Sequence, residues 1–578
     1  MFNTAGRTIK TGLTAAAIVS AWTWAATLLQ SSTVAYQYGI SGPFWYAAGA
    51  SIQVLLFGIL AIELKRKAPN AHTFLEIIRA RYGNGSHKIF LVFALMTNMI
   101  VTAMLLLGGS AVVNGLTGMD ISLAAFLIPI GVMIYTLVGG LKATFVADYM
   151  HTIIIFVVIL TFVAAVYVNT DITGGIEGMY DKLVQAAEIR PVEGNAAGAF
   201  LTMASAGGLM FGIINIVGNF GTVFVDQAYW QRAIAAQPGS TVKGFLLGGL
   251  CWFAIPFTLA TTMGLTAVAL DVDITMQQAQ MGLVVPAAAT ALMGEIGAIM
   301  VLTMLFMAVT SAGSAELIAV SSLVTYDLYR TYKNPKASGK QLVKVSRATI
   351  VAFGLGMGGL AVVLLSMGLS LGFVYLAMGI LIGSAVIPIA LTILWSKTNK
   401  VAATAGAVIG LFCSTTVWVA TAASLPEYGG VIDLASLGNN YSMLFANITA
   451  ILSGGAIAIA GSLAAGKTFD WNDLKEKITL VEVSAADQAA AAEDEETLKR
   501  AFKFSLKGGG LMTLILIVAW PLPLIASGYV FEMGSYAVWV GISIVWVGIA
   551  SAIIIFLPII EARKGIAKVF SGNSTKGA

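Results

Sequence analysis

The chain has 578 residues, of which 58% are hydrophobic and only 10% are charged, and its formal net charge is +4. A soluble domain usually carries about 25% charged residues, so this composition excludes an ordinary soluble protein and indicates a polytopic membrane protein. The small net charge gives no sign of nucleic-acid binding, because the basic residues are spread over short segments between apolar stretches.

Apolar stretches long enough to cross a bilayer recur along nearly the whole chain. A transmembrane helix needs about 20 mainly apolar residues, whereas a β-barrel would show short alternating segments. We therefore predict an all-α polytopic membrane protein with about 14 transmembrane helices. The predicted spans are residues 12–37, 42–63, 88–116, 121–141, 144–168, 198–224, 244–269, 296–327, 347–367, 370–395, 401–423, 441–466, 508–530 and 536–559.

The distribution of lysine and arginine predicts the orientation. Cytoplasmic loops carry an excess of these residues. If Arg7 and Lys10 are cytoplasmic, an even number of spans leaves both termini there, and of the basic residues only Lys182 and Arg190 fall outside. We expect a multi-pass protein of the cell (plasma) membrane with cytoplasmic N- and C-termini.

The first ten spans divide into two groups of five with opposite topology. This arrangement matches an inverted repeat, in which the first helix of each half is broken and the substrate lies near the bilayer midplane. In the first span, the polar run from Gln30 to Thr33 is expected to satisfy the freed backbone groups. In the sixth span, the expected break lies among the glycines Gly207, Gly208, Gly212, Gly218 and Gly221.

Three polar segments interrupt the apolar pattern. Residues 64–84 are expected to form a cytoplasmic surface helix, and residues 169–197 contain a short amphipathic stretch at 176–187. The third, 467–505, reads as a solvated cytoplasmic linker helix. We expect residues 1–400 to form a transport core and residues 401–578 to form accessory transmembrane helices.

Four short motifs resemble the sodium:solute symporter family. They are Tyr135 to His151 with its Gly139-Gly140 pair, the Gln-x-x-x-Gln-Arg element within 226–232, the Thr-x-Asp-x-Tyr ending of 321–329, and residues 394–398. They occur in order at the matching spans and cover about residues 10–400. The resemblance implies a LeuT-type 5+5 inverted-repeat core with about four extra C-terminal helices, and transport of a solute driven by an ion gradient.

A narrower resemblance points to the urea active transporters of fungi, plants and microbes. Residues 3–12, 22–32 and 62–73 carry long, unusual strings similar to that subfamily. The resemblance also implies one more helix before the core, so either this copy is shortened or the given start is internal.

The family resemblance places a cation site between the first and eighth core helices. It assigns backbone oxygens near Ser20 and Thr23, the carbonyl of Ala308 and the hydroxyl of Ser311, where a sodium ion would bind. The second hydroxyl of the family pair is missing, because that position is Ala312. This loss favours a proton over sodium as the coupling ion. The alternative is that these small residues form a packing stripe.

Three ionisable residues inside spans are candidates for coupling. An ionisable group within a span is costly and indicates function by default. Glu316 lies beyond Ser311 on the same span, while Asp148 and His151 lie one turn apart in the fifth span. The resemblance places Asp148 on the inner route of the cation. The alternative puts all three at the cytoplasmic boundary, hydrated.

The family's substrate positions fall on Asn219, Thr222 and Tyr375, with a helix-one position near Thr27. Three more residues of helix one lie in the same region, namely Trp22, Trp24 and Gln30. The amide, hydroxyl and indole groups of these candidates suit urea chemically. The alternative is that the aromatic residues are packing or interface groups and that the asparagine joins helices.

The leading interpretation is an ion-coupled secondary active transporter that imports urea by alternating access, with the proton favoured over sodium. The alternatives are a sodium-coupled symporter of a polyamine, proline or another amine, and a passive urea channel. No nucleophile–base set, metal spacing or phosphate loop suggests an enzyme, and no cofactor is expected. The expected partners are urea and the lipid bilayer, not nucleic acid.

Overall fold

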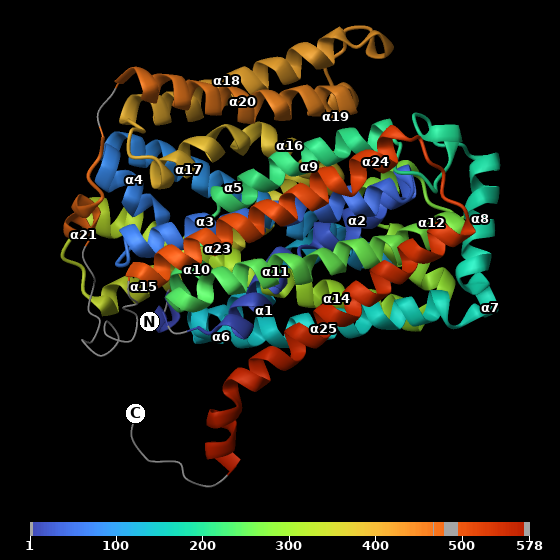
Figure 1. Ribbon diagram of the computed structural model, residues 1–578, viewed down its shortest axis with the longest axis horizontal. Helices are drawn as coiled ribbons and strands as arrows, with labels where there is room; N and C mark the ends of the chain where they lie inside the picture. Colours follow the sequence, from blue (N-terminus) through green and yellow to red (C-terminus); the bar gives the residue numbers. More distant parts are fainter. Residues whose placement is uncertain (1–3, 8, 466–467, 479–494, 571–578) are drawn as a thin grey trace.

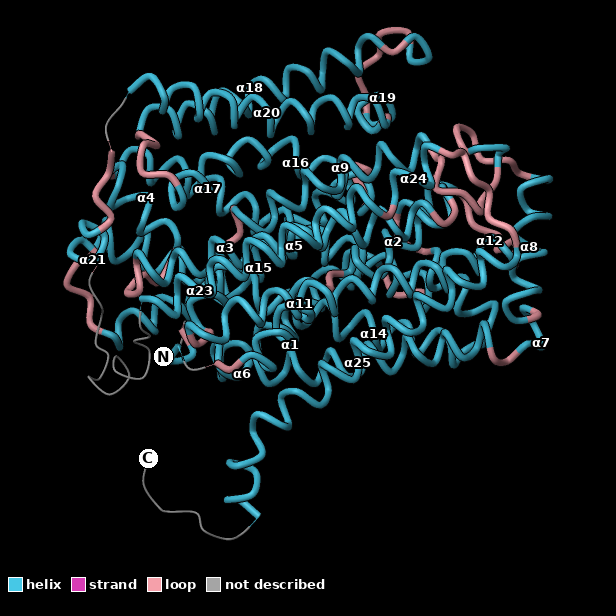
Figure 2. Tube along the Cα trace, in the orientation of Figure 1, coloured by secondary structure: helices cyan, strands magenta, loops and turns pink. Residues whose placement is uncertain are grey.

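The computed structural model describes residues 4–7, 9–465, 468–478 and 495–570, which form a bundle of long helices (Figures 1 and 2). Among these residues, 13 helices are long and apolar enough to cross a membrane, or 14 if a bent first pair counts as one span. The predicted all-α fold with about 14 spans is confirmed.

The helices of the first half of the core lie close to the predicted spans. They are η1 (Ala5–Arg7), α1 (Thr11–Trp22), α2 (Ala25–Tyr38), α3 (Ser41–Lys67), α4 (Phe74–Tyr82), α5 (Asn84–Thr117), α6 (Ile121–Tyr167), α7 (Thr170–Thr173), α8 (Gly175–Ile189) and η2 (Ala196–Gly198).

The remaining helices continue to the C-terminal end. They are α9 (Ala206–Phe224), α10 (Gln227–Ala235), α11 (Pro238–Leu259), η3 (Ala260–Gly264), α12 (Leu265–Ala269), α13 (Met276–Gln280), α14 (Val284–Ser322), η4 (Leu323–Lys333), α15 (Gly339–Ser366), α16 (Leu371–Ile382), η5 (Gly383–Ala385), α17 (Val386–Leu394), α18 (Lys400–Ser424), η6 (Pro426–Tyr428), α19 (Leu434–Gly438), α20 (Asn440–Ala465), α21 (Asn472–Lys477), α23 (Glu495–Leu514), η7 (Ile515–Ala519), α24 (Pro521–Ala526) and α25 (Met533–Phe570).

The first span is broken between α1 and α2, which bend by 59°. A helix end leaves backbone groups without hydrogen-bond partners. Here the Thr27 side chain is the partner of two such groups. Its hydroxyl accepts from the Trp24 amide at 3.0 Å and donates to the Trp22 carbonyl at 3.0 Å. The expectation that residues 30–33 would do this is wrong, because the hydroxyls of Ser31 and Thr33 donate to carbonyls one turn earlier in α2.

The break in the sixth span lies after the glycines and not among them. Helix α9 runs through all of them and ends at Phe224, and α10 begins at Gln227. The Asp226 carboxylate caps α10 by accepting from the Ala228 amide at 2.7 Å. The glycines instead allow close packing: a Cβ at Gly212 would lie 2.6 Å from the Trp45 ring. The predicted position of this break is therefore wrong.

A left-handed glycine divides the fourth and fifth spans, as predicted. Gly140 has φ 56° and ψ −163° inside α6, a conformation that costs little only for glycine. The two parts, Ile121–Leu141 and Ala143–Tyr167, match the predicted spans 121–141 and 144–168 closely.

The polar segments match less completely. The expected surface helix does not span residues 64–84. Helix α3 continues to Lys67, and only the nine residues of α4 form a separate helix after it. The amphipathic stretch corresponds to α8. Within the linker 467–505, α21 and the start of α23 are helical, while residues 466–467 and 479–494 lie outside the described part of the chain.

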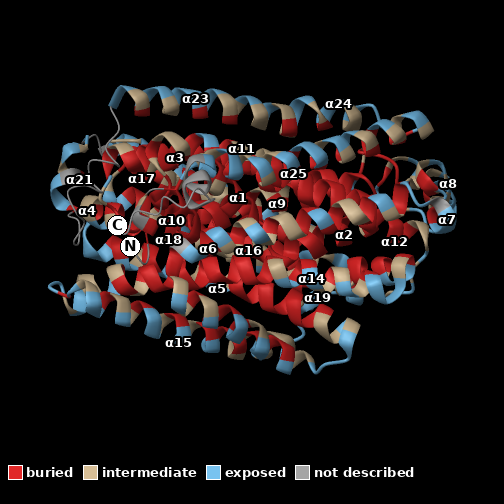
Figure 3. Cartoon of the chain, turned by 90° about the horizontal axis from the view of Figure 1, so that it is seen from below, coloured by how far each residue is buried: buried red, intermediate tan, exposed pale blue. Residues whose placement is uncertain are grey.

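The helices differ in how far they are exposed. Helices α1, α2, α3, α9 and α11 lie in the buried centre, whereas α15 and α23 expose one face along the edges (Figure 3). Many exposed side chains are large and apolar, as with Val138, which is 80% exposed, and such faces suit lipid. Helices α4 and α21 lie at the end near the N-terminus, and α8 and α12 at the opposite end (Figure 1). The proposed boundary at residue 400 stays a prediction.

Candidate functional site

A buried polar network joins the broken first helix to three other helices. The Ser20 and Ser311 hydroxyl oxygens lie 2.6 Å apart, within hydrogen-bond distance. The Ser311 hydroxyl also donates a hydrogen bond to the Asp148 carboxylate. The other carboxylate oxygen of Asp148 pairs with the Arg232 Nη2 at 3.2 Å. All four side chains are buried. The structure therefore brings together three residues predicted as cation or coupling ligands and adds an arginine.

Arg232 is held tightly against the first helix. Its Nε donates to the Ala17 carbonyl at 3.1 Å, and its Nη1 donates to the Ala228 carbonyl at 3.3 Å. The guanidinium is a permanent positive charge. Asp148 contacts both Arg232 and Ser311, so the guanidinium lies close to the Ser20–Ser311 contact. Its charge opposes the binding of a second cation there by Coulomb repulsion.

The other predicted cation ligands serve local structure. The Thr23 hydroxyl donates to the Val19 carbonyl at 2.6 Å, and its amide donates to the Ser20 carbonyl at 3.2 Å. Ala308 and Ala312 are fully buried in the main core on α14. This arrangement fits both interpretations of these residues, the ion site and the packing stripe.

Glu316 forms a second buried acidic centre with a residue that sequence reasoning did not single out. The Asn98 Nδ2 donates to the Glu316 carboxyl at 2.6 Å and to the Asp226 carboxyl at 2.7 Å. The Asp226 and Glu316 carboxyl groups therefore share one amide donor, and each acts on the other electrostatically. Two buried carboxylates this close repel each other when both are charged, so a proton on one of them stabilises the pair.

Burial decides against hydration at the membrane boundary for two of the three ionisable candidates. Asp148 is 0% exposed and Glu316 is 2% exposed. His151 differs, because it is partly exposed and its Nδ1 has no hydrogen-bond partner among the described residues. The structure does not join His151 to either acidic centre.

A neutral polar cluster lies between α9 and α16. The Asn219 Nδ2 donates to the Asn215 Oδ1 at 2.6 Å and to the Tyr375 hydroxyl at 3.2 Å. The Tyr375 hydroxyl donates to the Asn215 Oδ1 at 2.5 Å. The Tyr46 side chain interacts with Tyr375, on which its ring stacks, and with Thr27. Three predicted substrate residues, on α2, α9 and α16, thus lie in one group, which we name the central cluster: Thr27, Tyr46, Asn215, Asn219 and Tyr375.

Flat aromatic rings border the central cluster. The Tyr46 and Tyr375 rings stack at 5.4 Å, and Phe211 stacks on Tyr375 at 6.3 Å. On another side, the Trp22 ring lies 5.7 Å from the Trp252 ring, which is 6.4 Å from Tyr46. The cluster therefore combines neutral donors and acceptors with planar apolar walls.

The remaining predicted substrate residues play different parts. The indole of Trp22 donates to the Ala50 carbonyl at 2.7 Å, and that of Trp24 donates to the Ala21 carbonyl at 2.8 Å, so both brace backbone near the break. The Thr222 hydroxyl contacts only carbonyls of its own helix at 3.4 Å. Gln30 lies apart from the central cluster and lines a cavity of about 720 Å³.

Several residues of these centres were missed from sequence. Asn215 precedes Asn219 by four residues, so the helical spacing alone puts both amides on one face and could have found it. Asp226 lay inside a quoted motif. Asn98 and Tyr46 carried no comparable signal, because neither lies in one of the motifs that resemble the family or four residues from a predicted site residue.

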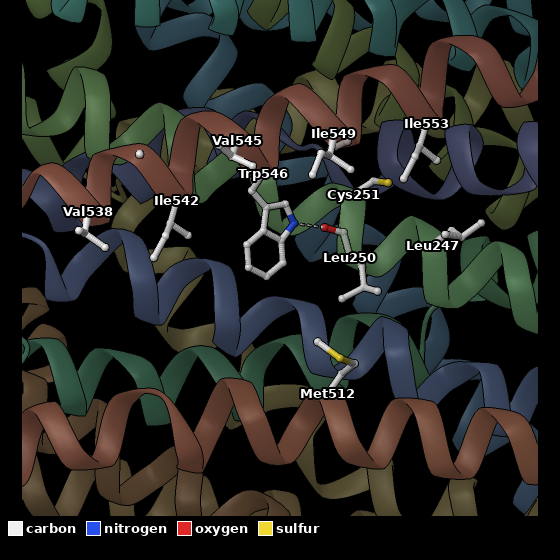
Figure 4. A pocket seen from close by; sticks show the side chains of 12 residues that line it. Leu247, Leu250, Cys251, Met512, Val538, Ile542, Val545, Trp546, Ile549 and Ile553 are labelled. Carbon is white, nitrogen blue, oxygen red and sulfur yellow. Dashed lines mark hydrogen bonds between the residues drawn. The ribbon is translucent and has the colours of Figure 1, made fainter.

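A separate cavity of about 650 Å³ between α11 and α25 is almost wholly apolar (Figure 4). Leu247, Leu250, Val545 and Ile549 line it. The Trp546 indole N–H donates to the Leu250 carbonyl at 2.9 Å, so it is not free to bind a ligand. Its chemistry suits a lipid chain and not a small polar solute.

Replacing Arg232 by Gln should destabilise the protein strongly, because it leaves Asp148 buried without its counter-charge, at a cost of about 3–5 kcal/mol. The double variant Arg232→Gln/Asp148→Asn should recover much of this loss. The measurement is thermal unfolding in detergent. Additive losses in the double variant would show that the two side chains do not act as a pair.

Comparisons with known proteins agree with this architecture. The sequence model of the sodium:solute symporter family matches residues 2–410. The urea-proton symporter DUR3 of Oryza sativa subsp. japonica is 55% identical, over 100% of this chain and 81% of that protein. The probable urea active transporter 1 of Schizosaccharomyces pombe (strain 972 / ATCC 24843) is 44% identical, over 99% of this chain and 86% of that protein.

A solved structure supports the fold independently. A substrate-bound, outward-open Na+-coupled sialic acid symporter superposes with a TM-score of 0.61 at 16% sequence identity, covering 79% of this chain and 92% of that chain. The predicted resemblance to the urea active transporters is confirmed by the relatives named above. The chain belongs to the sodium:solute symporter family.

Proposed function

We propose that this protein imports urea by ion-coupled alternating access, with the proton as the coupling ion. The observation that supports urea as the substrate is the central cluster, whose polar groups are amides and hydroxyls and are therefore neutral. The names of the relatives that match the full chain support the same substrate.

Urea fits the chemistry of the central cluster. It is small, planar and neutral, with one carbonyl acceptor and two NH₂ donors. The Asn215 and Asn219 amides and the Tyr375 hydroxyl provide acceptors and donors within one network, and the stacked rings provide flat walls. A site that pairs every polar group rejects molecules that leave one unpaired. In this structure these groups pair with one another, so binding exchanges internal hydrogen bonds for bonds to urea.

The Glu316–Asp226 pair supports proton coupling. A buried pair of carboxyl groups favours one proton between them because the two negative charges repel, and it can lose or regain that proton when the surrounding helices move. The cation site at Ser20 and Ser311 is less suited to sodium, because Ala312 lacks a hydroxyl and the Arg232 charge is close. Glu316 and Asp148 are therefore proposed as coupling residues, and His151 is not.

The membrane potential is sufficient to concentrate a neutral solute. One elementary charge crossing 100 mV releases about 2.3 kcal/mol. At about 1.4 kcal/mol per factor of ten, this corresponds to roughly a fifty-fold urea gradient for each coupled charge. We propose that the protein lies in the cell membrane, that the end carrying α8 faces outside, and that both termini are cytoplasmic, following the distribution of basic residues.

Reconstituted protein should accumulate labelled urea in liposomes when an inward proton gradient is imposed. Accumulation distinguishes a coupled carrier from a channel, through which urea only equilibrates. If another amine is concentrated while urea only equilibrates, the substrate is wrong. If a protonophore leaves accumulation intact in sodium-free buffer, proton coupling is wrong.

Replacing Asn219 or Tyr375 by Ala should raise the KM for urea roughly five- to hundred-fold, because a lost hydrogen bond with an unpaired partner costs about 1–3 kcal/mol. The matched control is Thr222→Val, one turn along α9, whose hydroxyl contacts only its own helix. Uptake kinetics at equal surface expression provide the measurement. An unchanged KM in both alanine variants would move the substrate site elsewhere.

Glu316→Gln should reduce accumulation strongly while leaving urea exchange between equal pools, since an amide cannot take up or release a proton. Glu295→Gln, an exposed position on the same helix α14, is the control and should transport normally. Accumulation that survives Glu316→Gln would exclude this carboxyl as the coupling group.

Ala312→Ser tests the reason given for weak sodium coupling. The variant restores the hydroxyl of the family pair beside Ser311, so uptake should gain stimulation by sodium. Uptake is compared with and without sodium at fixed pH. If the variant gains none, the stripe interpretation of Ala308, Ser311 and Ala312 is favoured over the ion site.

A further inference from the structure

The cavity of about 720 Å³ is lined by residues of α13, α16 and α19 among others, and it is rich in amide side chains. Its inner wall includes Phe211, whose ring stacks at 6.3 Å on Tyr375 of the central cluster. Phe211 therefore borders both the cavity and the central cluster. The amide residues that line it are Gln30, Gln37, Gln277, Gln280 and Asn440.

Gln30 presents a buried acceptor that lacks a donor. Its side chain is 1% exposed, and its Oε1 has no hydrogen-bond partner within the described residues. A buried carbonyl oxygen without a donor is unfavourable, and native structures seldom keep one without a reason. A ligand with N–H groups in the cavity would provide that reason.

Gln280 approaches the same place from α13, and Gly372 makes room for it. A Cβ atom at position 372 would overlap the Gln280 Oε1 and would lie 3.2 Å from the Gln30 Oε1. The two amide oxygens thus converge over one point on the first turn of α16. This convergence is independent of the unpaired Gln30 oxygen, and both observations call for a ligand with more than one donor.

We propose that Gln30 and Gln280 form an outer binding site for a neutral, planar amide of the urea class, which loads the central cluster past Phe211. The two NH₂ groups of urea would donate to the two converging oxygens, and Phe373 and Leu376 in the cavity lining offer apolar surface. The site deepens the proposed function and rests on urea being the solute.

A cysteine reporter can detect occupancy of this outer site without measuring transport. Gln277 is exposed in the same cavity, so Gln277→Cys should react with a polar maleimide. Urea should slow this labelling several-fold. The parent protein gives the background of its two cysteines, and Cys251, which is buried, becomes reactive only if a variant unfolds.

Added substitutions separate the outer site from the central cluster. Gln280→Leu, or Gly372→Ala, whose Cβ crowds the ends of the Gln280 and Gln30 side chains, should abolish protection by urea. Gly356→Ala on α15, where a Cβ meets open space, should keep it. Asn219→Ala should keep it as well, because the outer site fills independently.

Protection that survives both Gln280→Leu and Gly372→Ala, or that disappears with Asn219→Ala, would overturn the outer site. So would an absence of protection in protein that accumulates urea. Failure of the proposed function is a different result, namely that the parent does not accumulate urea at all.

Discussion

The buried ion pair between Arg232 and Asp148 is the interaction on which the transport core depends. Two charges removed from water are tolerated only when their remaining hydrogen-bonding groups are satisfied. Ser311 and the carbonyls of Ala17 and Ala228 do this, so one network ties α1, α6, α10 and α14 at the break of the first helix. A movement of any of these helices must preserve or exchange those bonds.

The position of this pair separates two kinds of chemistry. Arg232 pairs with Asp148, and it lies on α10, the helix that Asp226 of the Asp226–Glu316 pair caps. The central cluster, by contrast, consists of neutral amides, hydroxyls and rings. A neutral solute and an ion can therefore occupy different places while sharing the helices between them: α9 continues from Asn219 to the Asp226 cap of α10. This shared element is the physical basis we propose for coupling.

The sequence was sufficient to predict the spans but not the positions of the breaks. Apolar stretches of about 20 residues and the Gly139-Gly140 pair determine where the chain crosses and turns, and the structure agrees. The breaks in the first and sixth spans were misplaced, because they depend on partners from the adjoining turn, such as Thr27, and on a cap, Asp226, and not on glycine. Asn98 and Tyr46 were missed for a related reason: their roles depend on groups distant in sequence. Asn219 and Tyr375 were found only through the family resemblance.

The most direct test of the central claim is to follow the proton itself. Proteoliposomes containing this protein and a trapped pH indicator are diluted into sodium-free buffer, and urea is added outside. The account predicts that urea acidifies the lumen, that Glu316→Gln abolishes the signal, and that a protonophore collapses it. Urea accumulation that requires sodium and leaves the internal pH unchanged would contradict the account.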